Sequence, residues 1–246
     1  MSEKAHRISV IIPTLDEGKL IEETLKQFTH ELRERHALEI IISDGGSTDE
    51  TVIIARKYAD ALVRHSAGKL QNISLGRNAG ANAAKGEVLL FINADTHIEH
   101  ADEFLTEMSM ALRNGRVSGV TTNVHVYKNE ERLSDRLFHT ACNKYFWLLN
   151  VVGIGMGRGE CQAVRRELFF QVGGYNEAIA AGEDFELFVR VRRHGKIVFL
   201  NGHAVRESPR RFRKYGYLWI SFLWFLNAVS VLFFHRSVVS RWKPVR

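Results

Sequence analysis

Between residues 7 and 95 the chain alternates short, largely apolar runs with segments whose apolar side chains recur every three or four residues, and this alternation allows few folds. The apolar runs are RISVIIPT, ALEIIISD, DALVRH and EVLLFINAD. Runs of this length and composition are typical of buried parallel strands. Strands that alternate with helices predict an α/β protein, with a mostly parallel sheet flanked by helices on both faces.

Three helices are expected between these strands. Apolar spacing predicts one amphipathic helix over residues 17–35, with Asp16 as its N-cap. Ser47 and Glu50 have the spacing of a capping box and predict that the next helix begins there. The alanine-rich segment SLGRNAGANAAKG predicts the third helix.

Polar residues follow three of the expected strands, in segments 14–17, 44–49 and 93–97. The carboxyl ends of parallel strands meet at one edge of the sheet, and open α/β sheets bind their ligands there. The three segments therefore predict a binding site with acidic side chains.

The second half of the chain alternates less regularly. We expect a strand near residues 116–127, an apolar helix over 133–152, a glycine-rich loop GIGMGRGE, a helix after Glu183 and Asp184, and a strand over KIVFL. The motifs GxxxxGK[ST], GxGxxG, HExxH and GxSxG are absent, which disfavours P-loop NTPases, dinucleotide-binding enzymes, zinc proteases and α/β-hydrolases. The two cysteines, Cys142 and Cys161, form no CxxC pair and indicate a reducing compartment.

Four motifs occur in one order: IIPTLDEGKLIEETL, IIISDGGSTDET, GRNAGANAAKGEVLLFINADT and GYNEAIAAGEDFEL. Together they resemble the family 2 glycosyltransferases, from about residue 7 to about residue 200. The resemblance implies the GT-A fold, a Rossmann-like sheet, in a catalytic domain over residues 1–206. It also implies inverting, metal-dependent transfer of a sugar from a nucleotide-diphosphate sugar.

The resemblance also implies which residues bind the nucleotide. Those that match the family's nucleotide-binding motifs are Pro13, Leu15, Glu17, Asp44, Arg77, Asn78, Asn93 and Asp95. The first three would line the base and ribose, and Asp44 would bond the nucleobase edge. Arg77 and Asn78 would approach the diphosphate. Asp44 also has a plainer interpretation as a turn residue before a helix.

A divalent cation, Mn²⁺ or Mg²⁺, is implied as cofactor because it would neutralise the departing diphosphate. The family's Asp-x-Asp motif is Asn93-Ala94-Asp95 here, so one carboxylate is replaced by an amide. Asp95 matches the direct ligand, and His97 matches a second ligand position of polyprenyl-phosphate sugar synthases. An imidazole suits Mn²⁺ better than Mg²⁺. His97 is equally well interpreted as a solvated loop residue.

Asp184 matches the general base of the family, with Glu183 beside it to orient it or to contact the sugar. Glu160 would line the sugar or acceptor pocket. Arg210 and Arg211 could bind phosphate bidentately or belong to a basic cluster beside a membrane.

The segment Tyr217–Phe234 has 18 residues and no charge, a length of about 27 Å as a helix. Basic residues flank it on both sides, so residues 207–246 are interpreted as a basic and hydrophobic membrane-associating segment. A helix in the cytoplasmic leaflet, a spanning helix and a buried or dimer-forming helix all remain open. The N-terminal residues lack a signal peptide's apolar stretch, so we expect the protein at the cytoplasmic face of the membrane.

This location indicates a lipid-linked or saccharide acceptor and a role in cell envelope biogenesis. A catalytically inactive nucleotide-sugar binder or membrane scaffold is the alternative, because Asn93 weakens the metal motif. The net charge of +6 raises the possibility of nucleic-acid binding. It is disfavoured, because the basic residues cluster beside an apolar segment instead of among spaced aromatic residues.

Overall fold

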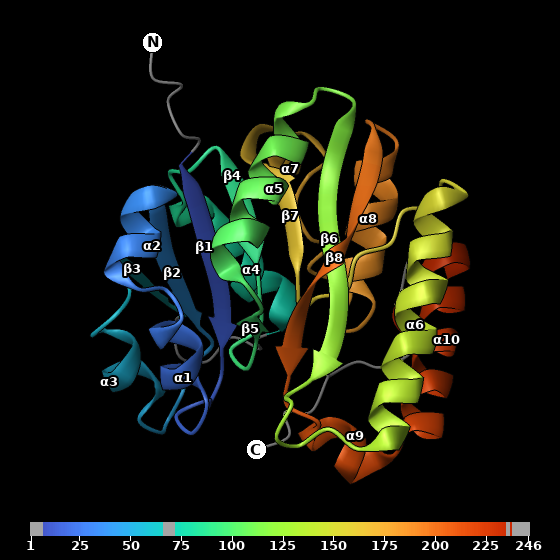
Figure 1. Ribbon diagram of the computed structural model, residues 1–246, viewed down its shortest axis with the longest axis horizontal. Helices are drawn as coiled ribbons and strands as arrows, with labels where there is room; N and C mark the ends of the chain where they lie inside the picture. Colours follow the sequence, from blue (N-terminus) through green and yellow to red (C-terminus); the bar gives the residue numbers. More distant parts are fainter. Residues whose placement is uncertain (1–6, 66–71, 235–236, 238–246) are drawn as a thin grey trace.

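The structure is a computed structural model that describes residues 7–65, 72–234 and 237 (Figure 1). Its strands are β1 Ile8–Thr14, β2 Leu38–Asp44, β3 Ala61–Arg64, β4 Val88–Phe91, β5 His97–Ile98, β6 Val117–Val126, β7 Gln162–Arg165 and β8 Lys196–Glu207. Its helices are α1 Ile21–Lys26, α2 His30–Arg35, α3 Thr51–Ala55, α4 Ile73–Ala83, α5 Ala101–Arg113, α6 Leu133–Val151, α7 Arg166–Gln171, α8 Glu183–Arg192, α9 Arg210–Tyr215 and α10 Tyr217–Phe234.

The strands form one sheet in the order β3-β2-β1-β4-β7-β6-β8-β5. The first four are parallel, as the alternation predicts, and β6 is parallel to β8. β7 is antiparallel to both β4 and β6, and β5 is antiparallel to β8. The expected mostly parallel α/β sheet is therefore confirmed.

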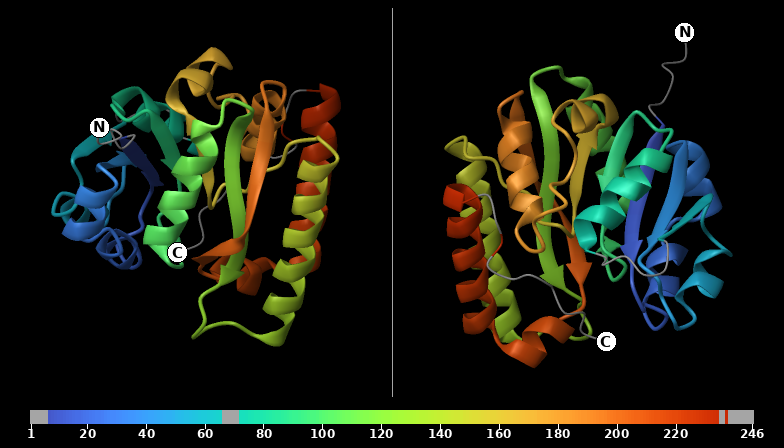
Figure 2. Two further views of the ribbon diagram at one scale, coloured as in Figure 1. Left: turned by 45° about the horizontal axis from the view of Figure 1, so that its top comes forward. Right: turned by 180° about the vertical axis from the view of Figure 1, so that it is seen from behind.

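Alternate residues of the central strands enter two cores, one on each face of the sheet. Val10 and Ile40 face the core that α1 and α5 cover, whereas Ile11 and Ile41 face the core of α4, α7 and α8. Figure 1 and the right-hand view of Figure 2 show these two helical layers from opposite sides. Burial on both faces explains why these strands are continuously apolar instead of alternating.

The prediction of one helix over residues 17–35 is wrong, because the segment forms α1 and α2. The hydroxyl of Thr29 accepts a hydrogen bond from the Leu32 amide and starts a second helix there. Asp16 is not the N-cap either. It has a left-handed φ of 51°, and its carboxylate accepts a hydrogen bond from the Thr48 amide.

The capping box predicted at Ser47 is also wrong. α3 begins at Thr51, and the Ser47 hydroxyl donates a hydrogen bond to Asp44 instead. The corrections at Asp16 and Ser47 have one cause. These short polar side chains follow a strand end and bond to other residues of the loops there instead of capping the next helix.

After β8, α9 leads into α10, which lies beside α6 in every view (Figures 1 and 2). The expected domain boundary after residue 206 falls one residue before the end of β8. The C-terminal segment is helical over Tyr217–Phe234. Among the helices of the described residues, none has both the length and the apolar character needed to cross a membrane. Most of the basic flank beyond residue 235 lies outside the described residues.

Candidate active site

The three polar segments after β1, β2 and β4 meet at one edge of the sheet, because these strands are parallel neighbours. Ser47 joins the first two segments, since its hydroxyl accepts a hydrogen bond from the Asp16 amide at 2.8 Å and donates one to Asp44. Asp44 is 1% exposed and also accepts hydrogen bonds from the amides of Gly46 and Ser47. Its carboxylate thus holds the loop after β2 in shape, and contact with a nucleobase stays a prediction.

Arg77, predicted to approach the diphosphate, is buried at the centre of the site with 1% of its surface exposed. Its Nη1 donates to Glu183 Oε1 at 2.9 Å, and its Nη2 donates to Asn93 Oδ1 at 3.1 Å and to the Gly159 carbonyl at 2.9 Å. A Cβ atom on Gly159 would come within 2.5 Å of Arg77 Nη2, so any larger residue there would displace the guanidinium. Arg77 therefore joins α4, the end of β4, the glycine-rich loop and α8.

Glu183 and Asp184 are the first two residues of α8, as predicted, and Gly182 precedes them with φ of 85°, which favours glycine. Burial and the neighbouring Asp184 raise the pKa of Glu183 to about 7, although Arg77 opposes this rise. Burial also raises the pKa of Asp184. Asp184 Oδ2 accepts a hydrogen bond from the Gly159 amide at 2.9 Å.

Asp95 lies at the opposite side of this centre and is paired with Arg210 of α9. Arg210 Nη2 lies 3.2 Å from Asp95 Oδ2 and 2.9 Å from Glu17 Oε1, so one guanidinium holds two of the three predicted nucleotide-binding carboxylates. Burial raises the pKa of Asp95, and Arg210 partly offsets that rise. The Tyr127 hydroxyl donates to the backbone carbonyl of Asp95 at 2.5 Å. The site thus accommodates a cationic group beside Asp95.

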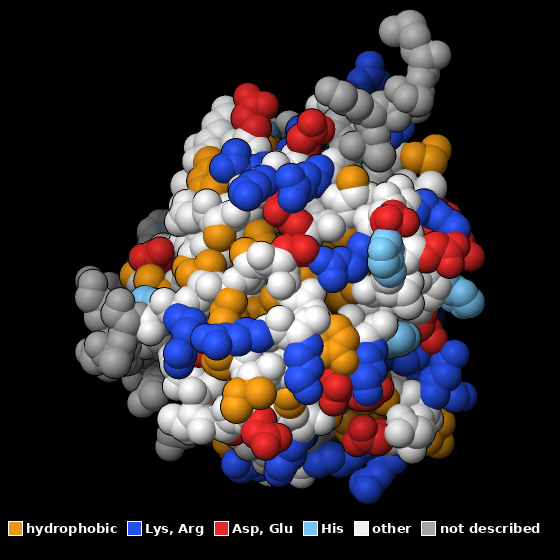
Figure 3. Space-filling model, turned by 90° about the vertical axis from the view of Figure 1, so that its left-hand side faces the viewer, with side chains coloured by type: hydrophobic (Ala, Val, Ile, Leu, Met, Phe, Trp, Pro, Cys, Tyr) orange, Lys and Arg blue, Asp and Glu red, His pale blue; other side chains and the backbone are white. Residues whose placement is uncertain are grey.

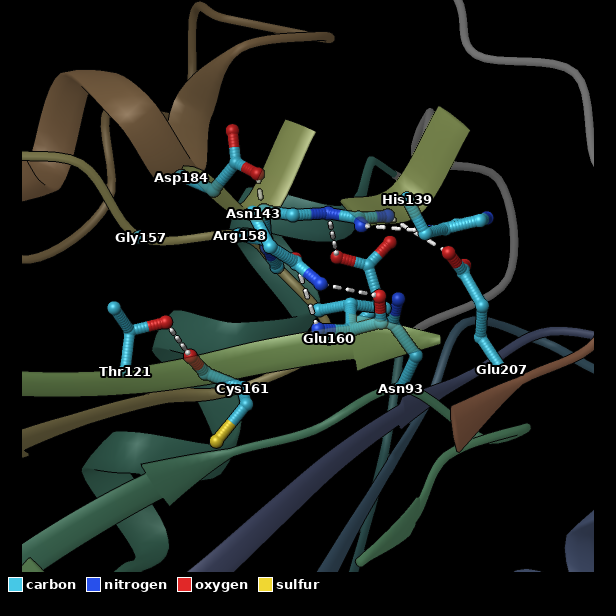
Figure 4. Close-up of polar contacts among 12 residues, drawn as sticks. Asn93, Thr121, His139, Asn143, Gly157, Arg158, Glu160, Cys161, Asp184 and Glu207 are labelled. Atoms are coloured by element: carbon cyan, nitrogen blue, oxygen red, sulfur yellow. Dashed lines mark hydrogen bonds and ion pairs between the residues drawn. The ribbon is translucent and has the colours of Figure 1, made fainter. Parts of the chain in front are cut away.

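A buried ionic cluster lies between these groups and helix α6 (Figure 4). Arg158 donates to Glu207 Oε1 at 2.7 Å, lies 3.2 Å from Glu160 Oε2 and donates to His139 Nδ1 at 3.3 Å. Burial opposes ionisation of Glu160, but Arg158, hydrogen bonds to the carboxylate and Arg77 together outweigh burial and lower the pKa of that carboxyl. Burial and the charge of Glu160 raise the pKa of Glu207 well above its ordinary value. The cluster therefore fixes Glu160 as an anion.

Two predicted site residues lie apart from this centre. The Asn78 side chain bonds the backbone amide and carbonyl of Tyr175, each at 2.9 Å, and so ties α4 to the loop before α8. His97 is exposed on β5 and lines a shallow hollow with Gln27 and Tyr127. Its role as a metal ligand stays a prediction. Within residues 7–65, 72–234 and 237, no three His, Cys, Asp or Glu side chains are grouped to hold a metal ion.

Sequence reasoning missed Arg158 and His139. Arg158 is the one charged residue in GIGMGRG, two positions before Glu160, and a cation near a predicted site acid could have been found from that spacing. His139 carried no such signal, because it is one of several polar residues spread along α6 and matches no motif.

The sequence profile of the family described as Glycosyl transferase family 2 matches residues 9–173. Among curated proteins, the succinoglycan biosynthesis protein ExoA of Rhizobium meliloti (strain 1021) is 26% identical over 201 residues, which are 78% of this chain and 59% of ExoA. The poly(ribitol-phosphate) β-N-acetylglucosaminyltransferase TarS of Staphylococcus aureus is 32% identical over 96 residues, 37% of this chain and 17% of TarS. The chain spans between 16% and 59% of the length of the curated relatives it matches.

Solved structures show the same GT-A-like fold. The mannosyltransferase PcManGT from Pyrobaculum calidifontis, in complex with GDP-Man and Mn²⁺, superimposes with a TM-score of 0.63 at 21% identity. That match covers 82% of this chain and 57% of PcManGT. Glucosyl-3-phosphoglycerate synthase from Mycobacterium tuberculosis superimposes with a TM-score of 0.58 at 20% identity. That match covers 92% of this chain and 79% of the synthase chain. Since the profile match covers most of the chain, this protein belongs to glycosyl transferase family 2.

Proposed function

We propose that the protein is an inverting glycosyltransferase that moves a sugar from a nucleotide-diphosphate sugar to a hydroxyl or phosphate group of a lipid-linked or envelope glycoconjugate. One observation carries the proposal. The Asp184 carboxylate is fixed at the start of α8 by the Gly159 amide, directly beside the Arg77–Glu183 ion pair. A carboxylate held in this way has the chemistry and the support of a general base.

In this reaction the acceptor oxygen attacks the anomeric carbon from the face opposite the diphosphate. The acceptor's proton passes to Asp184 as the new glycosidic bond forms, and the bond to the diphosphate oxygen breaks with its electron pair. Glu160, held as an anion by Arg158, offers a second carboxylate to sugar or acceptor hydroxyls. Arg210 and Arg211 lie on the α9 side of the site, where guanidinium groups suit phosphate oxygens.

The carboxylate oxygens of Asp95 fit a divalent cation that takes its other ligands from the diphosphate and water. The observation that supports this fit is the cation already accommodated there, since the Arg210 guanidinium lies 3.2 Å from Asp95 Oδ2. Asp95 would hold Mn²⁺ or Mg²⁺, with Asn93 nearby and His97 as a further candidate ligand. The bound ion would offset the charge that develops on the departing diphosphate.

Relatives and structural neighbours support the choice of donor class. TarS has been solved with UDP and with UDP-GlcNAc, and PcManGT with GDP-Man. The names of ExoA and TarS refer to succinoglycan biosynthesis and poly(ribitol-phosphate) glycosylation, which supports an envelope polysaccharide or glycoconjugate as the product. We further propose that the protein works at the cytoplasmic face of a membrane, with residues 207–246 attached to residues 1–206 as the membrane-associating segment.

A catalytically inactive nucleotide-sugar binder would not need a supported base. Gly182, Glu183 and Asp184, together with the Arg77 ion pair, are all present, and this favours the enzyme.

A thermal-shift screen against UDP, GDP, CDP and dTDP, each with Mn²⁺ or with EDTA, tests the donor site. A nucleotide present at 100 times its dissociation constant stabilises the folded state by about 2.7 kcal/mol, which is measurable. We expect one nucleotide to stabilise the protein, and to do so more strongly with Mn²⁺. Release of that nucleotide from its sugar conjugate then measures turnover. No stabilisation by any nucleotide would overturn the transferase proposal, and stabilisation without turnover would favour the inactive binder.

A further inference from the structure

Helices α6 and α10 expose most of the large apolar side chains in the described part of the chain. Sixteen such side chains are exposed there, and six belong to α6 and four to α10. Leu137, Tyr145 and Leu148 lie on the outer side of α6, with exposed fractions of 64%, 57% and 48%. Leu218 and Phe225 of α10 are 89% and 65% exposed. The two helices lie side by side (Figure 2), so these exposed apolar side chains belong to neighbouring helices.

The inner sides of the same helices explain why the apolar residues point outward. Ile220, Asn227 and Val231 are the buried residues of α10, and Phe146 is buried on α6. Phe138 stacks within 4.4 Å of Tyr217 and 6.2 Å of Trp224, measured between ring centroids, and so joins the two helices. The helices thus already have a packed core, and their outer side remains apolar in addition to it.

The exposed charged side chains on these helices have one sign, and exposed Glu130 and the Arg136 partner Glu131 lie in the segment just before α6. The only carboxylate in α6, α9 and α10 is Asp135, which is 0% exposed and is held by Arg213 and Tyr217. The exposed charges on α6 are those of Arg136 and Lys144, and Lys214 adds another on α9. On the opposite side of the molecule, acidic and basic side chains are interspersed (Figure 3).

We propose that the outer face of α6 and α10, here named the α6–α10 face, docks on a membrane surface that contains anionic phospholipids. An apolar face whose helices carry only cations as exposed charges binds where acyl chains meet negative headgroups. A second copy of the chain fits less well, since a twofold contact through this face would bring the same cations together. The inference rests on the membrane location proposed above and identifies α6, not α10 alone, as part of the contact.

Docking through this face places the lipid surface next to the site. α9 directly precedes α10, separated from it by Gly216 alone, and its Arg210 holds Asp95 and Glu17. An acceptor with a lipid anchor would therefore reach the site from the α9 side without leaving the membrane surface.

Vesicle flotation of the full chain tests the α6–α10 face. The test variant is Leu137→Glu with Leu148→Glu, both at exposed positions of α6, and it leaves α10 unchanged. The matched control is Ile53→Glu with Met110→Glu, at side chains 65% and 62% exposed on α3 and α5. We expect the wild type and the control to float with phosphatidylglycerol–phosphatidylcholine vesicles, and the α6 variant to partition at least about tenfold less. Wild-type protein that does not float, or an α6 variant that floats as well as the control, overturns the inference.

Two further measurements separate the possible causes. Sedimentation velocity without vesicles reports self-association, and a wild-type dimer that the α6 substitutions convert to a monomer overturns the inference in favour of a second copy. Calorimetry with UDP and GDP reports the donor site in the same preparations. Nucleotide binding without flotation refutes only the docking face, whereas flotation without nucleotide binding supports the face and refutes the proposed transfer.

Discussion

Arg77 and Glu183 form an ion pair at the centre of the site, with Nη1 and Oε1 2.9 Å apart and only 1% of the arginine exposed. The pair connects residues 106 positions apart in sequence, on α4 and α8. Arg77 also holds Asn93 and the Gly159 carbonyl, so it orders the backbone whose amide binds Asp184. We infer that Arg77 holds other site residues in position through these hydrogen bonds. The family resemblance implied that it would approach the diphosphate directly.

Replacement of Arg77 by Met leaves Glu183 buried without its partner. We expect the free energy of unfolding to fall by about 3–5 kcal/mol, the usual cost of breaking a buried ion pair. Urea denaturation measures the change. Lys26→Ala, which removes an exposed pair with Glu23, is the control and should leave the denaturation midpoint unchanged. A loss below about 1 kcal/mol for Arg77→Met would contradict this account.

Replacement of Asp184 by Asn removes the proposed base but preserves the size of the side chain. We expect kcat to fall by about 10²–10⁴-fold, the usual contribution of general base catalysis, with nucleotide affinity retained. Steady-state rates and calorimetry on the same protein separate the two effects. Glu186→Gln, on the same helix and paired with Arg190, should keep kcat within about twofold. Normal turnover in Asp184→Asn would assign the base to another residue.

The alternation of apolar runs and helical segments was enough to predict the parallel strands and α4, because buried strands and packed helices carry strong periodic patterns. Boundaries set by single hydrogen bonds were not predictable. Thr29 divides the expected first helix, and Ser47 bonds Asp44 instead of capping α3. Such choices depend on which partner lies closest in space, and periodicity does not contain that information.

The family resemblance predicted one site for Asp95, Arg77 and the acids of α8, of which Arg77 and Glu183 form a pair in the structure. It did not predict that Arg210, 115 positions after Asp95, would pair with it, because the path of β8 and α9 brings these residues together. The rest of the Arg158 cluster was missed for the same reason, since His139 of α6 and Glu207 of β8 are brought by the fold to the glycine-rich loop that carries Arg158 and Glu160.

Arg210 and a metal ion compete for Asp95 when no nucleotide is bound, because the guanidinium already lies 3.2 Å from Oδ2. Arg210→Gln should therefore bind Mn²⁺ more tightly than the wild type in the absence of nucleotide. The same variant should bind the nucleoside diphosphate about tenfold more weakly, since one charge-assisted contact to phosphate is lost. Electron paramagnetic resonance titration of free Mn²⁺ and calorimetry measure the two opposite changes.

The control for this pair of changes is Arg136→Gln, which removes an exposed α6 guanidinium paired with Glu131. It should alter neither affinity. If Arg210→Gln leaves Mn²⁺ affinity unchanged, the guanidinium does not occupy the metal position. If it leaves nucleotide affinity unchanged, Arg210 does not reach the diphosphate.

His139 makes stability depend on pH. Its ring is 0% exposed, Nδ1 accepts a hydrogen bond from Arg158, and Nε2 has no partner among the described residues. Burial, with the nearby Arg158 charge, lowers its pKa from 6.5 to about 3. The unfolded chain therefore binds one more proton than the folded protein between these values. The stabilisation is fully present above pH 6.5 and is lost as the pH falls towards 3.

We expect His139→Gln to remove this dependence, because glutamine keeps a polar side chain but does not titrate. Between pH 6.5 and pH 5 the wild type should lose stability relative to the variant by about 1 kcal/mol per pH unit. The quantity to compare is the difference in unfolding free energy between wild type and variant at each pH. Glu183, whose pKa rises to about 7, gives the stability of both proteins a pH dependence of opposite sign, and this cancels in the difference. Urea denaturation at several pH values measures it, with exposed His30→Gln as the control that keeps the wild-type slope. Parallel curves for His139→Gln and the wild type would show that the buried imidazole does not stay neutral in the folded protein.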